Sequence, residues 1–121
     1  MTDLVEVHNK DLWVDSLLVA RKFGMQHAIF VRNIESTLRD YPDIKGDLKS
    51  PLIDEKYYKE MRHYRGTDFE VYIMNRKLFS LVAMRMTTKK AREWQRKFND
   101  AFYEMENALL KAQHNKSDIE W

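Results

Sequence analysis

The side chains best suited to binding chemistry in this sequence are polar and basic hydrogen-bond donors within residues 26–39. Gln26 stands near the start of this segment, and Arg32 and Arg39 follow it. A glutamine side chain can pair with the edge of adenine, whereas arginine binds guanine or phosphate oxygens. These side chains would therefore suit a nucleic acid, provided that one rigid element presents them together.

Patterns typical of catalysis are missing from the sequence. The three glycines, Gly24, Gly46 and Gly66, are too far apart to form a phosphate-binding loop. The four histidines lack the spacing of a zinc site, and the absence of cysteine excludes disulfides and thiolate ligands. No serine stands in a nucleophile motif. The sequence predicts that the protein is not an enzyme and uses no metal or cofactor.

Two short helices joined at Gly24 would present the candidate residues. Asp15 and Ser16 can cap the first helix, and Gly24 suits the left-handed position that ends it. In residues 26–39 an apolar stripe starts at His27, which favours a packed or capping histidine over a ligand. The pair predicts a helix-turn-helix, whose second helix lies in the major groove. Many plain helical hairpins share these features, so that interpretation stays open.

The remaining segments predict two hairpins and two more helices. Residues 4–7 and 12–14 form the first hairpin, and residues 41–55 form an irregular loop. The second hairpin joins residues 56–64 to residues 69–74. Its basic residues resemble those of a wing that contacts DNA, and an ordinary hairpin with a solvated tip explains them equally well. Helices follow over 76–86 and from about residue 88 to 113. The predicted fold is α+β, with two β-hairpins, four helices, a winged-helix-like pair and a long C-terminal helix.

The last helix carries apolar residues at alternating steps of three and four, which is a heptad pattern. This stripe has two interpretations: it packs onto the third helix, or it joins two copies of the chain. The candidate dimerisation residues are Trp94, Phe98, Ala101, Met105 and Leu109.

Positive charge is concentrated in two stretches, although the net charge of the chain is only +2. Residues 16–39 carry +3 and residues 75–97 carry +7, and both would attract a polyanion if they lay on one face. A solvated helix face is the alternative. The predicted DNA-binding residues are Gln26, His27, Arg32, Asn33, Arg39, Arg62, Arg65, Lys89, Lys90 and Arg92.

A series of short motifs, spread over roughly residues 4–110, matches a known family in order and spacing. These motifs are Asp15-Ser16, Val19-Ala20, Phe23-Gly24, His27, Val31, Ile34, Tyr72, Asn75-Arg76, Phe79, Leu81, Met84, Thr88-Lys89-Lys90-Ala91, Phe98, Ala101-Phe102 and Met105-Glu106. Through them the chain resembles the phage regulatory proteins of the Rha family. The resemblance implies a small α+β regulator encoded by a phage or prophage that binds DNA. An antirepressor that binds a repressor protein through the C-terminal helix is the rival function.

Length and hydropathy complete the expectations. We expect one domain over residues 1–113 followed by a flexible tail over 114–121. No apolar run approaches the roughly 18 residues that span a bilayer, and the N-terminus does not resemble a secretion signal. The expected setting is the cytoplasm of a bacterial host, with double-stranded DNA as partner and a homodimer as the functional unit.

Overall fold

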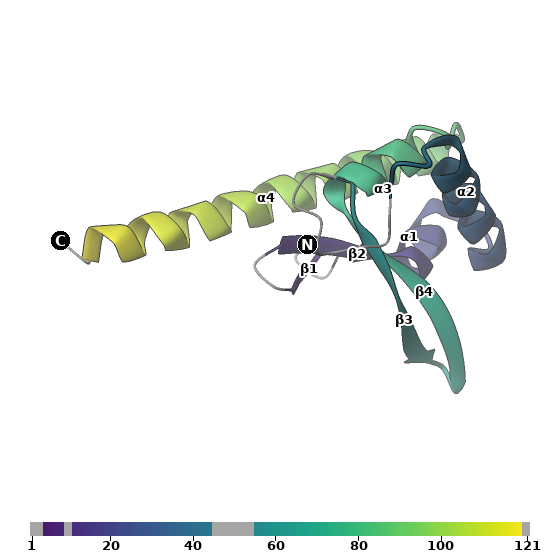
Figure 1. Ribbon diagram of the computed structural model, residues 1–121, viewed down its shortest axis with the longest axis horizontal. Helices are drawn as coiled ribbons and strands as arrows, with labels where there is room; N and C mark the ends of the chain where they lie inside the picture. Colours follow the sequence, from purple (N-terminus) through teal and green to yellow (C-terminus); the bar gives the residue numbers. More distant parts are fainter. Residues whose placement is uncertain (1–3, 9–10, 45–54, 120–121) are drawn as a thin grey trace.

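A computed structural model describes residues 4–8, 11–44 and 55–119, with side chains described through Ala112. The described residues form an antiparallel sheet with helices packed against it, which confirms the predicted α+β class (Figure 1). Residues 9 and 10 of the first predicted turn and residues 45–54 of the predicted loop lie outside the described part. The elements are β1 (Glu6–His8), β2 (Asp11–Asp15), α1 (Ser16–Phe23), α2 (His27–Asp40), β3 (Tyr57–Tyr64), β4 (Thr67–Asn75), α3 (Arg76–Ala83) and α4 (Lys89–Ile119).

The sheet order β1-β2-β4-β3 joins the two predicted hairpins along β2 and β4. Trp13 of β2 pairs with Asn75 of β4, although α1, α2 and β3 lie between these strands in the sequence. The long β3–β4 hairpin projects from the body of the molecule (Figure 1). The strand before α1 is therefore fixed directly to this hairpin, which sets the position of α1 relative to it.

The β3–β4 hairpin closes through two residues instead of the predicted four. Arg65 and Gly66 both have positive φ values, 50° and 80°. Two consecutive residues of this kind give a turn whose twist matches that of the strands. The strands therefore pair up to Tyr64 and Thr67, and β4 begins two residues earlier than the sequence suggested.

The α1–α2 connection follows the sequence prediction closely. Asp15 caps α1 by accepting a 2.7 Å hydrogen bond from the N–H of Leu17. Gly24 has φ 75°, and the N–H of Met25 donates to the carbonyl of Ala20 at 3.0 Å. This pattern is the glycine-terminated end of a helix. The chain therefore reverses within three residues, and α2 begins at His27.

Aromatic side chains from four helices fill the centre of the core. Phe79 of α3 lies with its ring centroid 5.3 Å from that of Phe98 and 6.3 Å from that of Phe23. Phe30, which the sequence placed beside the apolar stripe of α2, is completely buried against Phe23. The first turn of α2 is thus anchored by an aromatic residue, so its orientation depends on the core.

Helices α3 and α4 differ from the predicted bounds. α3 ends at Ala83, three residues before the predicted Met86, because Arg85 and Met86 donate to carbonyls only three residues back. Thr88 then caps α4 by accepting a 3.1 Å hydrogen bond from the N–H of Ala91. α4 continues to Ile119, past its predicted end near residue 113, and its distal half extends beyond the body (Figure 1).

Replacing Gly24 with alanine is expected to destabilise the protein by about 1 kcal/mol, because an L-residue is strained at this φ. An added Cβ would also lie 2.9 Å from Cδ of Lys90 and displace that side chain. Gly66→Ala is the matched control, since its φ is similar but no described atom lies within 4 Å of its Cβ. Urea unfolding should show a similar loss of unfolding free energy for both variants, because both place an L-residue at a positive φ. A Gly24→Ala protein as stable as wild type would contradict this prediction.

Candidate nucleic-acid interface

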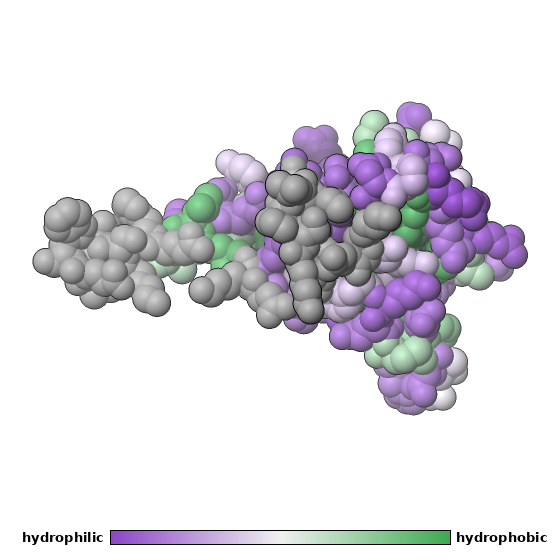
Figure 2. Space-filling model, viewed as in Figure 1, coloured by the Kyte–Doolittle hydropathy of each residue, from purple (hydrophilic) through white to green (hydrophobic). Residues whose placement is uncertain are grey.

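Helix α2 turns its basic side chains outward. Phe30, Ile34 and Thr37 face the core and are buried, whereas Arg32 and Arg39 on the opposite side are exposed. Gln26, the residue before the helix, is also exposed, and its side chain makes no capping hydrogen bond. Hydrophilic residues predominate at the end of the molecule that carries α2, with small hydrophobic patches among them (Figure 2). This helix therefore presents an accessible polar face.

His27 is held inside the fold. Its Nε2 lies 2.9 Å from Oγ of Ser16, and that Oγ accepts a 2.9 Å hydrogen bond from the N–H of Tyr72. Burial lowers the pKa of His27, and the nearby charge of Asp15 opposes this shift. His27 is thus half-buried and, through Ser16, joins α2 to α1 and β4.

Asn33 is also turned away from the exposed face. Its Nδ2 donates to Sδ of Met86 at 3.6 Å, across the connection between α3 and α4. Arg85 in the same connection donates to Oγ of Ser36 at 3.3 Å and forms an ion pair with Asp40. These contacts fix α2 against the α3–α4 connection.

The second basic stretch meets the turn between α1 and α2. The side chain of Lys90, in the first turn of α4, lies against Gly24. A cleft of about 380 Å³ separates the two segments and is lined by Gly24 and Met25 on one side and by Thr88 and Lys90 on the other. Lys89, Lys90 and Arg92 are all exposed. The two basic stretches, far apart in the sequence, therefore lie side by side at the glycine turn.

The tip of the β3–β4 hairpin reaches α1. The ring of Tyr64 contacts two guanidinium groups, with Cζ of Arg21 at 4.3 Å and Cζ of Arg65 at 5.3 Å from the ring centroid. The ring of Phe69 lies 6.3 Å from that of His27. Arg65 at the tip and Arg21 of α1 thus contact the same ring, and Arg21 adds a cation that sequence analysis did not select.

Comparison with known protein families identifies the family of the chain. The family model of phage regulatory protein Rha matches residues 14–107, which is most of the chain. The chain belongs to the Rha family. No curated protein and no solved structure gives a significant match. The family description identifies a phage regulatory protein, in agreement with the resemblance seen in the sequence. The matched region of this Rha-family chain holds α1, α2, the β3–β4 hairpin and the start of α4.

Arg62 differs from the other predicted DNA-binding residues of the Rha-family chain, because acidic residues surround it. Its guanidinium donates to both carboxylate oxygens of Glu6, at 2.5 and 2.7 Å, and to Glu60 at 2.7 Å. It also donates to Oδ2 of Asp15 at 3.1 Å. The hydrogen bond to Glu6 is the largest cause of a raised pKa of Arg62. The charge of Arg62 is therefore balanced within the fold and links β3 to β1 and to the cap of α1.

The predicted dimerisation stripe is largely used inside the Rha-family monomer. Phe98 and Ala101 are buried, with 0% and 1% exposure, because they pack on the aromatic core. Trp94, Met105 and Leu109 are half-buried against the same core. The heptad pattern of α4 thus mainly reflects packing onto its own domain. This is the interpretation that the sequence offered beside dimerisation.

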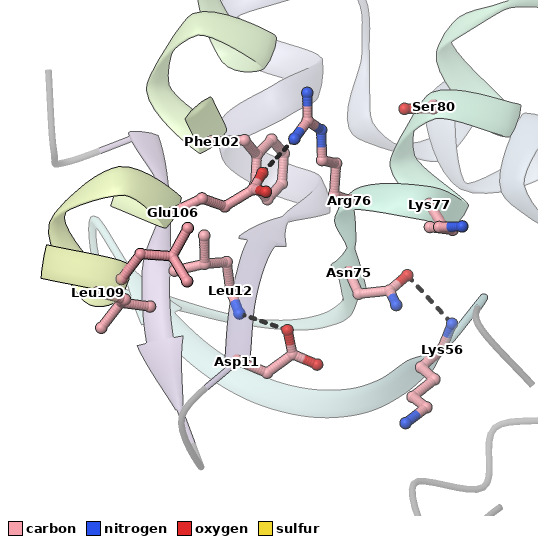
Figure 3. Close-up of a pocket in the computed structure, with 11 residues that line it drawn as sticks. Asp11, Leu12, Lys56, Asn75, Arg76, Lys77, Ser80, Phe102, Glu106 and Leu109 are labelled. Atoms are coloured by element: carbon pink, nitrogen blue, oxygen red, sulfur yellow. Dashed lines mark hydrogen bonds and ion pairs between the residues drawn. The ribbon is translucent and has the colours of Figure 1, made fainter. Parts of the chain in front are cut away.

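A larger pocket of about 740 Å³ lies away from α2, between β2, α3 and the distal half of α4 (Figure 3). Arg76 and Glu106 form an ion pair across it, and Leu12 and Leu109 supply apolar wall. None of the predicted DNA-binding residues lines it.

Within the described residues, no group of three acidic or histidine side chains could hold a metal ion. None of the described helices has the length and hydropathy to cross a membrane.

Proposed function

We propose that this Rha-family protein regulates transcription by binding double-stranded DNA through α2. The observation that carries the proposal is the contact between Lys90 and Gly24, which brings the basic start of α4 to the α1–α2 turn. A double helix is a dense line of negative charge, so neighbouring cations favour its binding. A basic face on α2 alone, without the lysines of α4 beside it, would support DNA binding much less.

In this proposal α1 and α2 form a helix-turn-helix, and α2 lies in the major groove. α2 has 14 residues and is about 21 Å long. Gln26 and Arg32 face base edges, and Arg39 reaches the groove edge or the phosphates. Lys89, Lys90 and Arg92 contact phosphates beside the turn.

The β3–β4 hairpin acts as the wing in the same arrangement. β2, β4 and β3 are neighbouring strands, and β2 leads directly into α1. Arg65 at the hairpin tip shares the Tyr64 ring with Arg21 of α1. A wing fixed in this way would carry Arg65 and Arg21 to the DNA backbone next to the groove that holds α2.

We also propose that the protein works as a homodimer through the distal half of α4. Leu110 and Tyr103 are both 61% exposed, and Met105 and Leu109 are near the same part of the helix. A symmetric dimer would place two copies of α2 on half-sites about 34–36 Å apart or a multiple of that distance. Such a dimer would make twice as many DNA contacts as a monomer. We expect it to act in the cytoplasm of the host.

The second candidate function is an antirepressor that binds a phage or host repressor protein. The same exposed side chains of the distal α4, Tyr103 and Leu110, favour it. Both functions agree with a family of phage regulatory proteins. They differ in what the basic surface around Gly24 contacts.

The test is the salt dependence of duplex binding. Neutralising four to six phosphates should make log affinity fall with log salt at a slope of about −4 to −5. Lys89→Ala should make the slope about one unit shallower. Lys111→Ala is the matched control, because it removes an exposed lysine from the distal half of α4 and should leave the slope unchanged. Fluorescence anisotropy with labelled duplexes gives the slopes.

Two outcomes would overturn the DNA proposal. Absence of duplex binding at low salt would favour the antirepressor, and equal effects of Lys89→Ala and Lys111→Ala would remove the start of α4 from the interface. Light scattering on the same protein stock gives the mass of the particle, and a monomeric mass at binding concentrations would overturn the dimer.

A further inference from the structure

The exposed face of α2 carries one large apolar side chain. Ile29 is 44% exposed, whereas Phe30 and Ile34 are completely buried. Val31 and Leu38, the other large apolar residues of α2, pack against the core. Ile29 is therefore the large apolar residue of α2 that solvent reaches most, and its neighbour Ala28 is exposed as well.

Ile29 and Arg32 share one side of α2. Residues three apart on a helix differ by about 60° around its axis and by about 4.5 Å along it, so their side chains are neighbours. Phe30 and Ile34 define the buried side, and Arg32 lies opposite it. Ile29 lies beside Arg32 on the flank of the exposed face, near the N-terminal end of the helix. This is the end through which recognition helices contact bases.

We propose that Ile29 contacts the C5 methyl group of a thymine while Arg32 binds the neighbouring guanine. The inference rests on the proposed DNA-binding function and specifies which bases α2 reads. Thymine is the base that offers a methyl group in the major groove, and apolar side chains recognise it by contact. Guanine offers the O6 and N7 acceptors that arginine binds. The half-site therefore contains a thymine next to a guanine, placed under the first turns of α2.

The test needs no known operator. The wild-type protein is used to enrich duplexes from a random 24-base-pair pool, and the enriched duplex is resynthesised with deoxyuridine at one thymine position at a time. Deoxyuridine removes only the methyl group. At one position per half-site it should weaken wild-type binding about fivefold or more, within the range for a lost base contact.

Variants assign this effect to a residue. The Ile29→Ala protein should bind the thymine duplex and the deoxyuridine duplex with equal affinity. Val31→Ala is the matched control, and this protein should still bind the thymine duplex more tightly than the deoxyuridine duplex. In the same duplex, 7-deazaguanine lacks the N7 acceptor and should weaken binding by wild type but not by Arg32→Ala. Circular dichroism confirms that each variant is folded.

The outcomes separate this inference from the function on which it rests. If no duplex is enriched, DNA binding itself fails. If duplexes are enriched but deoxyuridine has no effect, or has the same effect on wild type and Ile29→Ala, DNA binding stands and the thymine contact is overturned. If Ile29→Ala weakens every duplex equally, Ile29 has no role in choosing a base, and the inference fails as well.

Discussion

Arg62→Ala is expected to lower the free energy of unfolding by about 2–3 kcal/mol, because it leaves carboxylates without their partner. Glu6, Asp15 and Glu60 converge on the Arg62 guanidinium, and the side chain of Asp15 is only 12% exposed. Asp15 also caps α1, so the loss extends to the first helix of the interface. Urea unfolding followed by circular dichroism measures the change.

The pH dependence of this loss gives a second measurement. The hydrogen bond from Arg62 is the largest cause of the lowered pKa of Glu6, which burial opposes. A carboxylate with a lowered folded pKa adds stability above its unfolded pKa and loses it as pH falls through the folded pKa. The difference between wild type and Arg62→Ala should therefore be full at pH 7 and should shrink as the pH falls below about 4.5.

Arg65→Ala is the matched control for Arg62→Ala. Both residues are arginines of the same hairpin, but Arg65 is exposed at the turn and contacts the Tyr64 ring. Its loss should change stability by about 0.5 kcal/mol or less. Equal destabilisation by the two variants would show that the carboxylate cluster does not hold the hairpin to β1.

Local sequence patterns were enough to predict most of the fold. Asp15, Gly24 and Thr88 act at helix ends through side-chain or backbone chemistry that depends on near neighbours. The alternation of Phe69, Val71 and Ile73 likewise predicted that they share one face of a half-buried strand, and in the structure that face packs against Trp13. Such features are short-range, so their spacing in the sequence is sufficient.

Contacts between distant segments were not predictable in the same way. Nothing in the sequence shows that Glu6, Asp15 and Arg62 converge, because this depends on the sheet order β1-β2-β4-β3. Arg21 and Tyr64 meet for the same reason. The sequence showed two basic stretches without showing that they lie on one face, and the path of α3 and α4 is what brings Lys90 to Gly24.

The heptad stripe of α4 shows a different limit. Phe98 and Ala101 have the spacing of a helix–helix seam, and the same spacing serves packing within a monomer or between monomers. In this fold both residues are buried in the core of their own domain, where Phe98 contacts Phe79. Periodicity therefore identifies the apolar face of a helix, whereas the identity of its partner comes from the tertiary structure.

Ser16→Ala is expected to destabilise the protein by about 1–3 kcal/mol, because it leaves a buried backbone N–H without an acceptor. Ser16 is completely buried, and its Oγ accepts from the N–H of Tyr72 and contacts Nε2 of His27. One hydroxyl thus joins β4, the start of α1 and the start of α2. The variant should also bind DNA more weakly, since the first turn of α2 loses one of its two anchors while Phe30 remains.

Ser36→Ala is the matched control, because Ser36 lies on α2 but its hydroxyl contacts only the long Arg85 side chain among the described groups. Arg85 keeps its ion pair with Asp40 in that variant, so the expected loss is about 0.5 kcal/mol or less. Equal losses in the two variants would contradict the anchoring role of Ser16. A Ser16→Ala protein that is destabilised but binds duplexes with wild-type affinity would show that Phe30 alone holds α2 in its binding orientation.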